Sequence, residues 1–266
     1  MRITFCFLVL LMLTAACSER KSPDMPAVTI EQSADTLRTV SIHHELENAA
    51  GHCQVDFDWP MEGSPALQKA VREYIITALF DGGYSSLPNN PDTLATLWCE
   101  RKLASFEKSL DDMKIQVSGP NEAPEEGIKI MKAWENDKLV TYEVSGFSYF
   151  TGGGRGTFGT RGATFRKRDG HRYGKEIIKN TDDHLHALMI VGLMRFFEVT
   201  DTNALKEKMT IAPDLLPMPD YPPYLMADGL RFQYNVYDIC RFDDGDPWFS
   251  IDWDDIKPYL NVETSP

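Results

Sequence analysis

Hydrophobic and polar residues alternate with a period of two along residues 38–59 of this 266-residue chain. Val40 and Ile42 have polar neighbours on either side, and residues 53–59 repeat the pattern with larger side chains. Successive side chains of a strand point to opposite faces of a sheet, so this alternation is typical of half-buried strands. The segment therefore predicts two strands.

Two helices are predicted next. Residues 64–79 begin with Ser64 followed by proline, a preferred start for a helix, and continue with apolar residues at intervals of three and four. Residues 90–110 begin in the same way, with Asn90 followed by proline. We expect both helices to pack on a sheet.

The C-terminal part of the chain predicts further hairpins and one more amphipathic helix. The expected strands are residues 128–134, 139–149, 163–165, 230–240 and 248–253, and the expected helix starts at residues 181–183. The pattern predicts an α+β fold of two packed subdomains, with antiparallel sheets that are each covered by one or two helices. The N-terminal subdomain would span residues 37–120 and the C-terminal domain residues 121–266.

Residues 1–16 have the features of a signal peptide. Arg2 precedes an apolar run over residues 3–13, and three small residues follow before Cys17. The run is too short to cross the hydrocarbon core of a bilayer, which needs about 20 apolar residues. We expect cleavage before Cys17.

Residues 13–17, with the sequence Leu-Thr-Ala-Ala-Cys, resemble the bacterial lipobox. The resemblance implies that Cys17 is lipidated and anchors the protein to a membrane, on the outer membrane in a Gram-negative cell because Ser18 follows. Residues 17–36 are polar and are expected to form a flexible tether outside the cytoplasm. The alternative is ordinary secretion with Cys17 left as a thiol.

The formal net charge is −13, and loss of the signal peptide would remove only Arg2 and leave −14. Such an acidic protein repels nucleic acid and anionic surfaces and favours cationic partners. We therefore expect no nucleic-acid binding. The basic run at residues 166–168 is expected to be a solvated surface.

Of the five cysteines, Cys6 would leave with the signal peptide and Cys17 would be lipidated. We expect a disulfide between Cys53 and Cys99, because both lie in the N-terminal part of the chain and the compartment is oxidising. Cys240 lies in an apolar segment, where a buried free thiol is common.

Four segments resemble, in order, the extracytoplasmic domain of RsiV-type anti-sigma factors and the non-catalytic part of PdaC-type cell-wall deacetylases. They are residues 149–156, 170–178, 229–237 and 251–260. The earlier strands and helix resemble the companion domain that precedes this domain in the family. The resemblance implies an extracytoplasmic binding or sensing domain.

The glycine-rich loop departs from the family pattern, which has Ala-His where this chain has Gly154 and Arg155. Arginine is permanently charged and suits the clamping of a carboxylate or a carbonyl. Gly152, Gly153, Arg155 and Gly156 are therefore candidate ligand-binding residues. The alternative is structural, since glycines permit an unusual backbone path and Arg155 could pair with an internal acid.

No catalytic or metal-binding motif is apparent. His43 and His44 are adjacent in a strand, and His184 and His186 are two apart in a helix, so neither pair shares a face. The acidic loop at residues 243–246 lacks the ligand series of an EF-hand and is expected to be a turn. We expect no catalytic residue, no metal and no cofactor.

The sequence accordingly predicts a cell-envelope lipoprotein with a non-catalytic binding or sensing module. Its ligand would be a peptidoglycan fragment or a cationic envelope-active protein such as lysozyme, and the acidic charge fits the latter. One alternative is an enzyme acting on envelope glycans, with Arg155, Asp238 and Asp252 near a cleft. Another is a structural lipoprotein without a small ligand.

Overall fold

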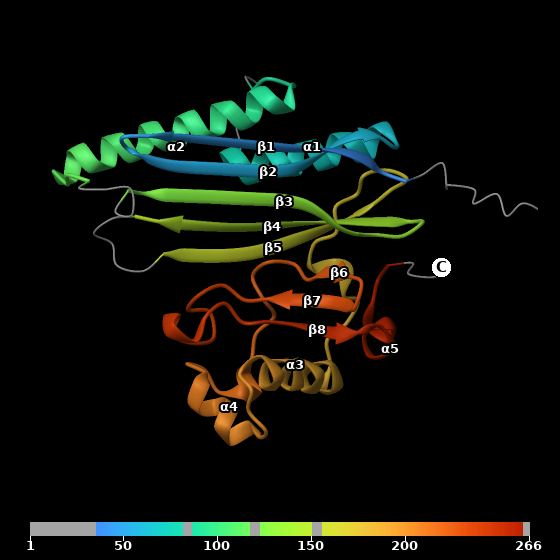
Figure 1. Cartoon of the computed structure of the whole chain (residues 1–266). Coiled ribbons are helices and arrows are strands. Elements are labelled where there is room, and N and C mark those ends of the chain that lie inside the picture. The colour runs from blue at the N-terminus through green and yellow to red at the C-terminus, as the bar shows by residue number, and fades with distance from the viewer. Residues whose placement is uncertain (1–35, 82–86, 118–122, 151–155, 263–266) are drawn as a thin grey trace, which may run out of the picture. The chain divides into compact units, whose positions relative to one another are not determined.

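The structure is a computed structural model that describes residues 36–81, 87–117, 123–150 and 156–262. Within these ranges the chain forms two β-sheets flanked by helices, which confirms the α+β class (Figure 1). None of the helices in the described ranges is both long and apolar enough to cross a membrane. Cys17 and the expected signal peptide and tether, which ends at residue 36, lie almost entirely outside the described residues.

The first sheet contains five strands in the order of the chain, and all neighbours pair antiparallel except β2 and β3, which are parallel. The strands are β1 (Arg38–Asn48), β2 (Gly51–Glu62), β3 (Glu125–Glu135), β4 (Leu139–Tyr149) and β5 (Thr157–Arg166). A parallel pair needs a long crossover connection, and here two helices supply it.

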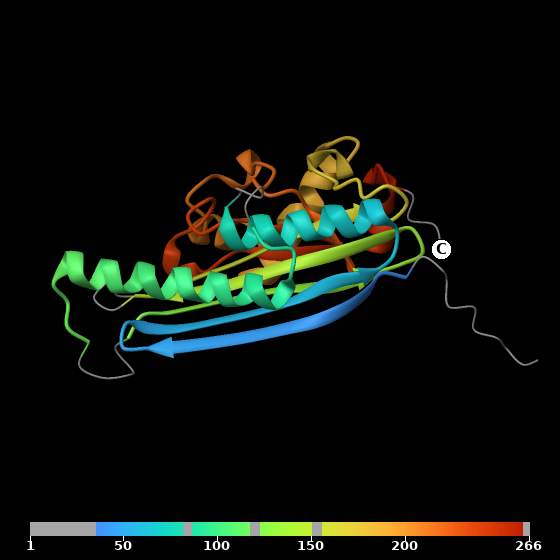
Figure 2. The ribbon, with the colours of Figure 1, turned by 90° about the horizontal axis from the view of Figure 1, so that it is seen from above.

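These helices, α1 (Pro65–Phe80) and α2 (Pro91–Met113), lie on one face of the first sheet (Figure 2). Their predicted start signals are present, since the Ser64 hydroxyl accepts a hydrogen bond from the Leu67 N–H and the Asn90 side chain accepts one from the Thr93 N–H. Phe57 of β2 is fully buried in the core beneath them.

The subdomain boundary expected near residue 120 falls between two strands of the same sheet. His52 to Phe57 of β2 pair in parallel with residues 125–130 of β3, so the segments on either side of the boundary share one sheet. Local alternation predicts the strands of a hairpin, but it carries no signal for pairing across a connection that contains two helices.

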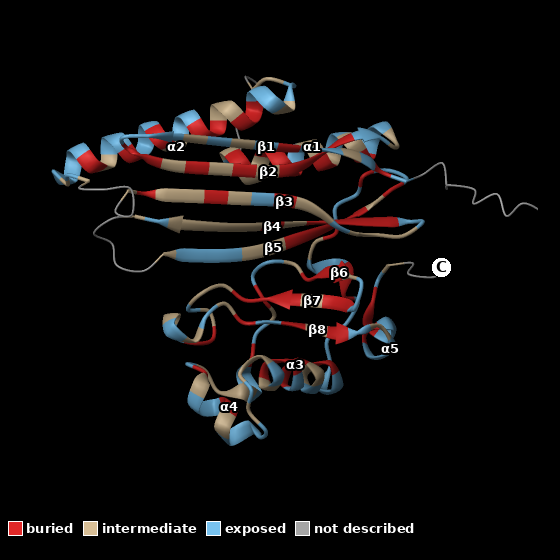
Figure 3. Ribbon diagram, viewed as in Figure 1, coloured by how far each residue is buried: buried red, intermediate tan, exposed pale blue. Residues whose placement is uncertain are grey.

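The second sheet has three antiparallel strands, β6 (Tyr224–Met226), β7 (Gly229–Gln233) and β8 (Trp248–Asp252). Its apolar face packs against α3 (Asp183–Phe196), where the Phe249 ring lies directly against Gly192. Figure 3 shows that β7 is buried along most of its length. Two short helices, α4 (Thr202–Lys208) and α5 (Trp253–Ile256), complete this part.

The strand expected over residues 230–240 is shorter than predicted, because β7 ends at Gln233. Beyond it the chain turns: the Asn235 N–H donates to the Asp238 carboxylate at 2.8 Å, and Tyr237 has a φ of 71°. A side-chain acceptor that captures a nearby backbone N–H competes with strand pairing, which explains the early end.

Candidate functional site

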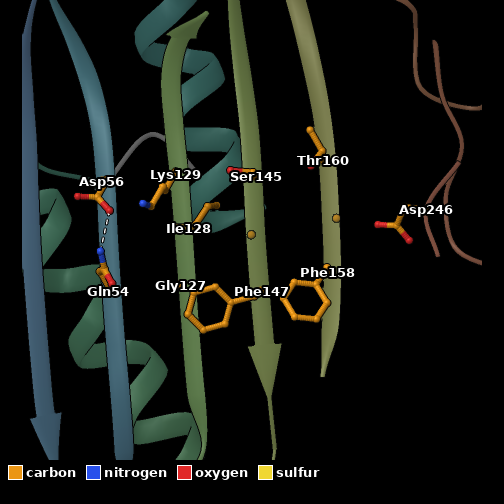
Figure 4. Close-up of a pocket in the computed structure, with 12 residues that line it drawn as sticks. Gln54, Asp56, Gly127, Ile128, Lys129, Ser145, Phe147, Phe158, Thr160 and Asp246 are labelled. Carbon is orange, nitrogen blue, oxygen red and sulfur yellow. Dashed lines mark hydrogen bonds between the residues drawn. The ribbon is translucent and has the colours of Figure 1, made fainter. Parts of the chain in front are cut away.

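The face of the first sheet opposite α1 and α2 is polar. Gln54 and Asp56 of β2, Lys129 of β3, Ser145 of β4 and Thr160 of β5 lie next to one another across the strands (Figure 4). The Gln54 amide donates a hydrogen bond to the Asp56 carboxylate at 2.9 Å. The period of two that buries one set of side chains under the helices therefore presents the other set to this open face.

Two phenylalanines stand out on this polar face. Phe147 of β4 and Phe158 of β5 are direct cross-strand partners, and Phe158 is 70% exposed. A Cβ atom at Gly127 of β3 would lie 2.3 Å from the Phe147 ring, so this ring lies across β3 and needs the glycine beneath it. The two rings form an apolar platform in otherwise polar surroundings (Figure 4).

The second sheet turns its polar side toward the first. Tyr224 of β6 and Arg231 of β7 are register partners, and both donate to Glu143 of β4, at 2.9 and 3.1 Å. The Tyr224 ring lies over Gly162 of β5, where a Cβ atom would come within 2.3 Å. Burial raises the pKa of Tyr224, and the nearby Glu143 carboxylate adds to the effect, so the phenol stays a hydrogen-bond donor.

Two adjoining hollows lie along this junction and share Phe158, Thr160 and Asp246. They measure about 230 and 540 Å³ and together reach the size of ordinary small-molecule sites. We call them the inter-sheet groove. Its main side chains are Gln54, Asp56, Lys129, Phe147, Phe158 and Thr160 from the first sheet and Gln233, Asp246 and Trp248 from the second part of the chain.

The second wall of the groove adds another aromatic ring. Trp248 at the start of β8 is 45% exposed, and the Arg231 guanidinium lies 4.6 Å from its ring centroid. Arg231 also reaches Glu143, so the tryptophan is tied to the junction of the two sheets. Burial raises the pKa of the neighbouring Asp246 carboxyl.

Among the predicted ligand-binding residues, Gly156 lines the groove. Gly152, Gly153 and Arg155 lie outside the described residues. The structure thus brings one end of the glycine-rich loop to the groove.

The acids proposed for catalysis do not line the groove. Asp238 accepts the Asn235 N–H within a turn, and Asp252 lies exposed at the end of β8, where α5 begins.

Cys53 and Cys99 lie in contact, since the Cys99 thiol is 3.5 Å from the Cys53 carbonyl oxygen. Both are fully buried, and the structure carries them as free thiols. Cys240 is also fully buried, and the structure carries it as a free thiol.

In the described part of the chain, no group of three or more His, Cys, Asp or Glu residues is placed to hold a metal ion. The acidic turn is held by cations instead: Asp244 pairs with Arg241 at 3.4 Å and with Lys208 at 3.6 Å. His184 lies within hydrogen-bonding distance of the Tyr259 hydroxyl, at 2.7 Å.

The basic run at residues 166–168 is not uniformly solvated, contrary to the prediction. Lys167 is only 5% exposed and pairs with Glu135 at 2.8 Å. Burial alone would raise the pKa of Glu135, but its bonds to Lys167, Lys132 and the Leu37 N–H outweigh that effect and lower it. The Glu135 carboxylate thereby compensates the charge of the Lys167 ammonium, which would otherwise be costly to bury.

The fold is that of solved DUF3298 family structures. A member from Bacteroides fragilis superposes with a TM-score of 0.67 at 22% identity, covering 87% of this chain and 96% of that one. A second, from Pseudomonas aeruginosa, gives 0.55 at 14% identity over 86% and 96%. No family model and no curated protein matches the sequence.

Proposed function

We propose that this protein is a cell-envelope lipoprotein, a relative of the RsiV/PdaC-type extracytoplasmic domains, whose inter-sheet groove binds the glycan of a peptidoglycan fragment without cleaving it. The observation that carries the proposal is the set of aromatic rings displayed in a polar groove. Cys17 would hold the protein on the membrane, on the outer membrane in a Gram-negative cell.

The aromatic rings favour a ligand with flat apolar faces. Phe158 and Trp248 expose apolar surface to water, and a ligand that covered these rings would gain binding free energy by removing that surface from water. A pyranose ring presents C–H groups on its faces and hydroxyls around its edge. Its faces would lie on the Phe147–Phe158 platform and against Trp248.

The polar lining suits the edge of the same ligand. Gln54, Asp56 and Thr160 offer both donors and acceptors for hydroxyl and acetamido groups. The side chains that line the groove include two carboxylates, Asp56 and Asp246, and one ammonium, Lys129. This balance disfavours phosphate-rich ligands such as nucleic acid and anionic lipid headgroups.

The test is a binding titration of the full chain, kept in detergent micelles, against chitotetraose and against a disaccharide-tetrapeptide muropeptide. We expect F158A and W248A each to weaken binding about tenfold, which corresponds to a loss of about 1.4 kcal/mol of binding free energy. Leu215, which is 71% exposed and does not line the groove, supplies the control variant L215A, which should bind as the unaltered protein does.

Salt and product analysis separate the competing functions. Stacking and neutral hydrogen bonds should change little between low and physiological salt, and the muropeptide should be recovered intact. Cleavage of the muropeptide would instead identify an enzyme. Salt-sensitive binding of lysozyme without glycan binding would favour capture of a cationic protein by the acidic surface. Binding of neither would favour a structural lipoprotein.

A further inference from the structure

We propose that Cys53 and Cys99 become a disulfide that crosslinks β2 to α2 and that this bond forms while the protein folds. The inference concerns the covalent structure of the core and is separate from the groove, which lies on the opposite face of the sheet.

The geometry brings the two residues together from elements far apart in sequence. Cys53 faces the helices from β2, and Cys99 lies on the face of α2 that is buried against the sheet. The Cys99 thiol is 3.5 Å from the Cys53 carbonyl oxygen and also contacts the Cys53 thiol. Side chains in such contact need only small rotations to reach the S–S distance of about 2.05 Å.

The third described cysteine is placed differently. Cys240 belongs to the second part of the chain, where its thiol lies 3.5 Å from the Gly245 carbonyl oxygen. It is not part of the core that contains Cys53 and Cys99. The pairing is therefore specified by the fold.

The burial of both thiols determines the stage of folding at which the disulfide can form. Exchange requires a thiolate that can reach its oxidant, but both thiols are fully buried in the folded chain. The contact with Cys99 and burial raise the pKa of Cys53, so the folded thiol is also unreactive. Oxidation must precede the final packing of α2 on β2.

The chemistry needs an external disulfide as oxidant. One cysteine thiolate attacks it and forms a mixed disulfide with release of one thiol, and the second cysteine then displaces the other thiol. The two cysteines lose two protons and two electrons in total, and the oxidant is reduced to two thiols.

The first test is peptide mapping by mass spectrometry of the full chain, produced with its own N-terminal segment and unfolded without reductant in the presence of an alkylating agent, so that buried free thiols are blocked. We expect a linked Cys53–Cys99 peptide pair and an alkylated Cys240. A bond from either residue to Cys240 would contradict the proposal. Free Cys53 and Cys99 would also contradict it, unless the pair forms in the second test.

The second test is independent of where the protein resides in the cell. The full chain is reduced in denaturant and refolded with a mixture of oxidised and reduced glutathione, and the same peptides are mapped. Formation of the pair here but not in cells would support the pairing and count against the proposed location. Failure of the pair to form in either experiment would overturn the inference.

Melting curves provide the control by variants. The C53S and C99S variants should each have a Tm about 10 °C below that of the unaltered chain, and so should unaltered chain that is reduced in denaturant and refolded without oxidant. The reason is that the unfolded chain, without the crosslink, has more conformational entropy. C240S should not respond to the oxidant differently from the unaltered chain. Oxidant added to reduced, already folded protein should leave the two thiols unlinked over the time in which refolding links them.

Discussion

The two faces of the first sheet are built from the same strands, but one is apolar and buried and the other is polar and open. On the face toward α1 and α2, Val55, Phe57 and Ile130 are fully buried in a continuous apolar core. On the other face, Asp56, Lys129 and Ser145 occupy the alternate positions of β2, β3 and β4. The second sheet meets that face through Tyr224 and Arg231, with polar contacts and a groove.

The difference teaches that stability and recognition are separated by the pleat of the strands. Apolar burial under the helices supplies the folding free energy, so the opposite face is free to carry polar groups and exposed rings. Substitutions one residue apart in sequence should therefore have unlike effects.

The largest expected effect compares two phenylalanines, one on each face. F57A removes a fully buried ring and should lower the free energy of unfolding by about 3–5 kcal/mol. F158A removes a ring that is 70% exposed and should change it by less than about 0.5 kcal/mol. Denaturant titrations of both variants measure the contrast, and similar losses would refute the separation of the two faces.

The next effect concerns two glycines of β5. G162A would drive a methyl group into the Tyr224 ring and should cost about 1–3 kcal/mol through overpacking. It should also disturb the Tyr224–Glu143 bond that holds the second sheet in place. G159A is the matched control, because a Cβ atom there meets nothing within 4 Å. Equal stability of the two variants would show that the sheets do not meet through Tyr224.

The smallest effect is a pH dependence at the strand ends of the polar face. His52 lies 2.8 Å from Glu45 and 3.2 Å from Glu125. Burial would lower its pKa, but these two carboxylates outweigh burial and raise it.

Because the pKa of His52 is raised in the folded state, its protonated form stabilises the fold. This stabilisation is complete below the unfolded-state pKa of about 6.5 and is lost as pH rises through the folded-state pKa. Relative to the unaltered chain, H52Q should cost about 0.5–1 kcal/mol at pH 6 and less at pH 8. Melting curves across this range test the sign, and a cost that grows with pH would contradict it.

The sequence predicts local structure here better than it predicts partners. Ser64 and Asn90 mark the helix starts because capping is a local interaction, and the hairpins follow from alternation. The parallel pairing of β2 with β3 was not foreseen, since strand alternation shows which face is buried but not which strand lies alongside.

The candidate site was foreseen only in part. Gly156 lines the groove, and the glycine-rich loop was the signal for it. Phe147, Phe158 and Trp248 were missed, because an aromatic residue in a strand is ordinarily a core residue and its exposure depends on distant elements. In hindsight Phe147 shares the phase of Glu143 and Ser145 in β4, which indicates the polar face.

The most direct test of groove binding is hydrogen–deuterium exchange of the full chain with and without saturating muropeptide. The inter-sheet groove predicts slower exchange in peptides that cover β5 and residues 233–248, with no change in α1 and α2. Protection confined to the helices, or no protection at saturation, would contradict the assignment of the open face as the binding site.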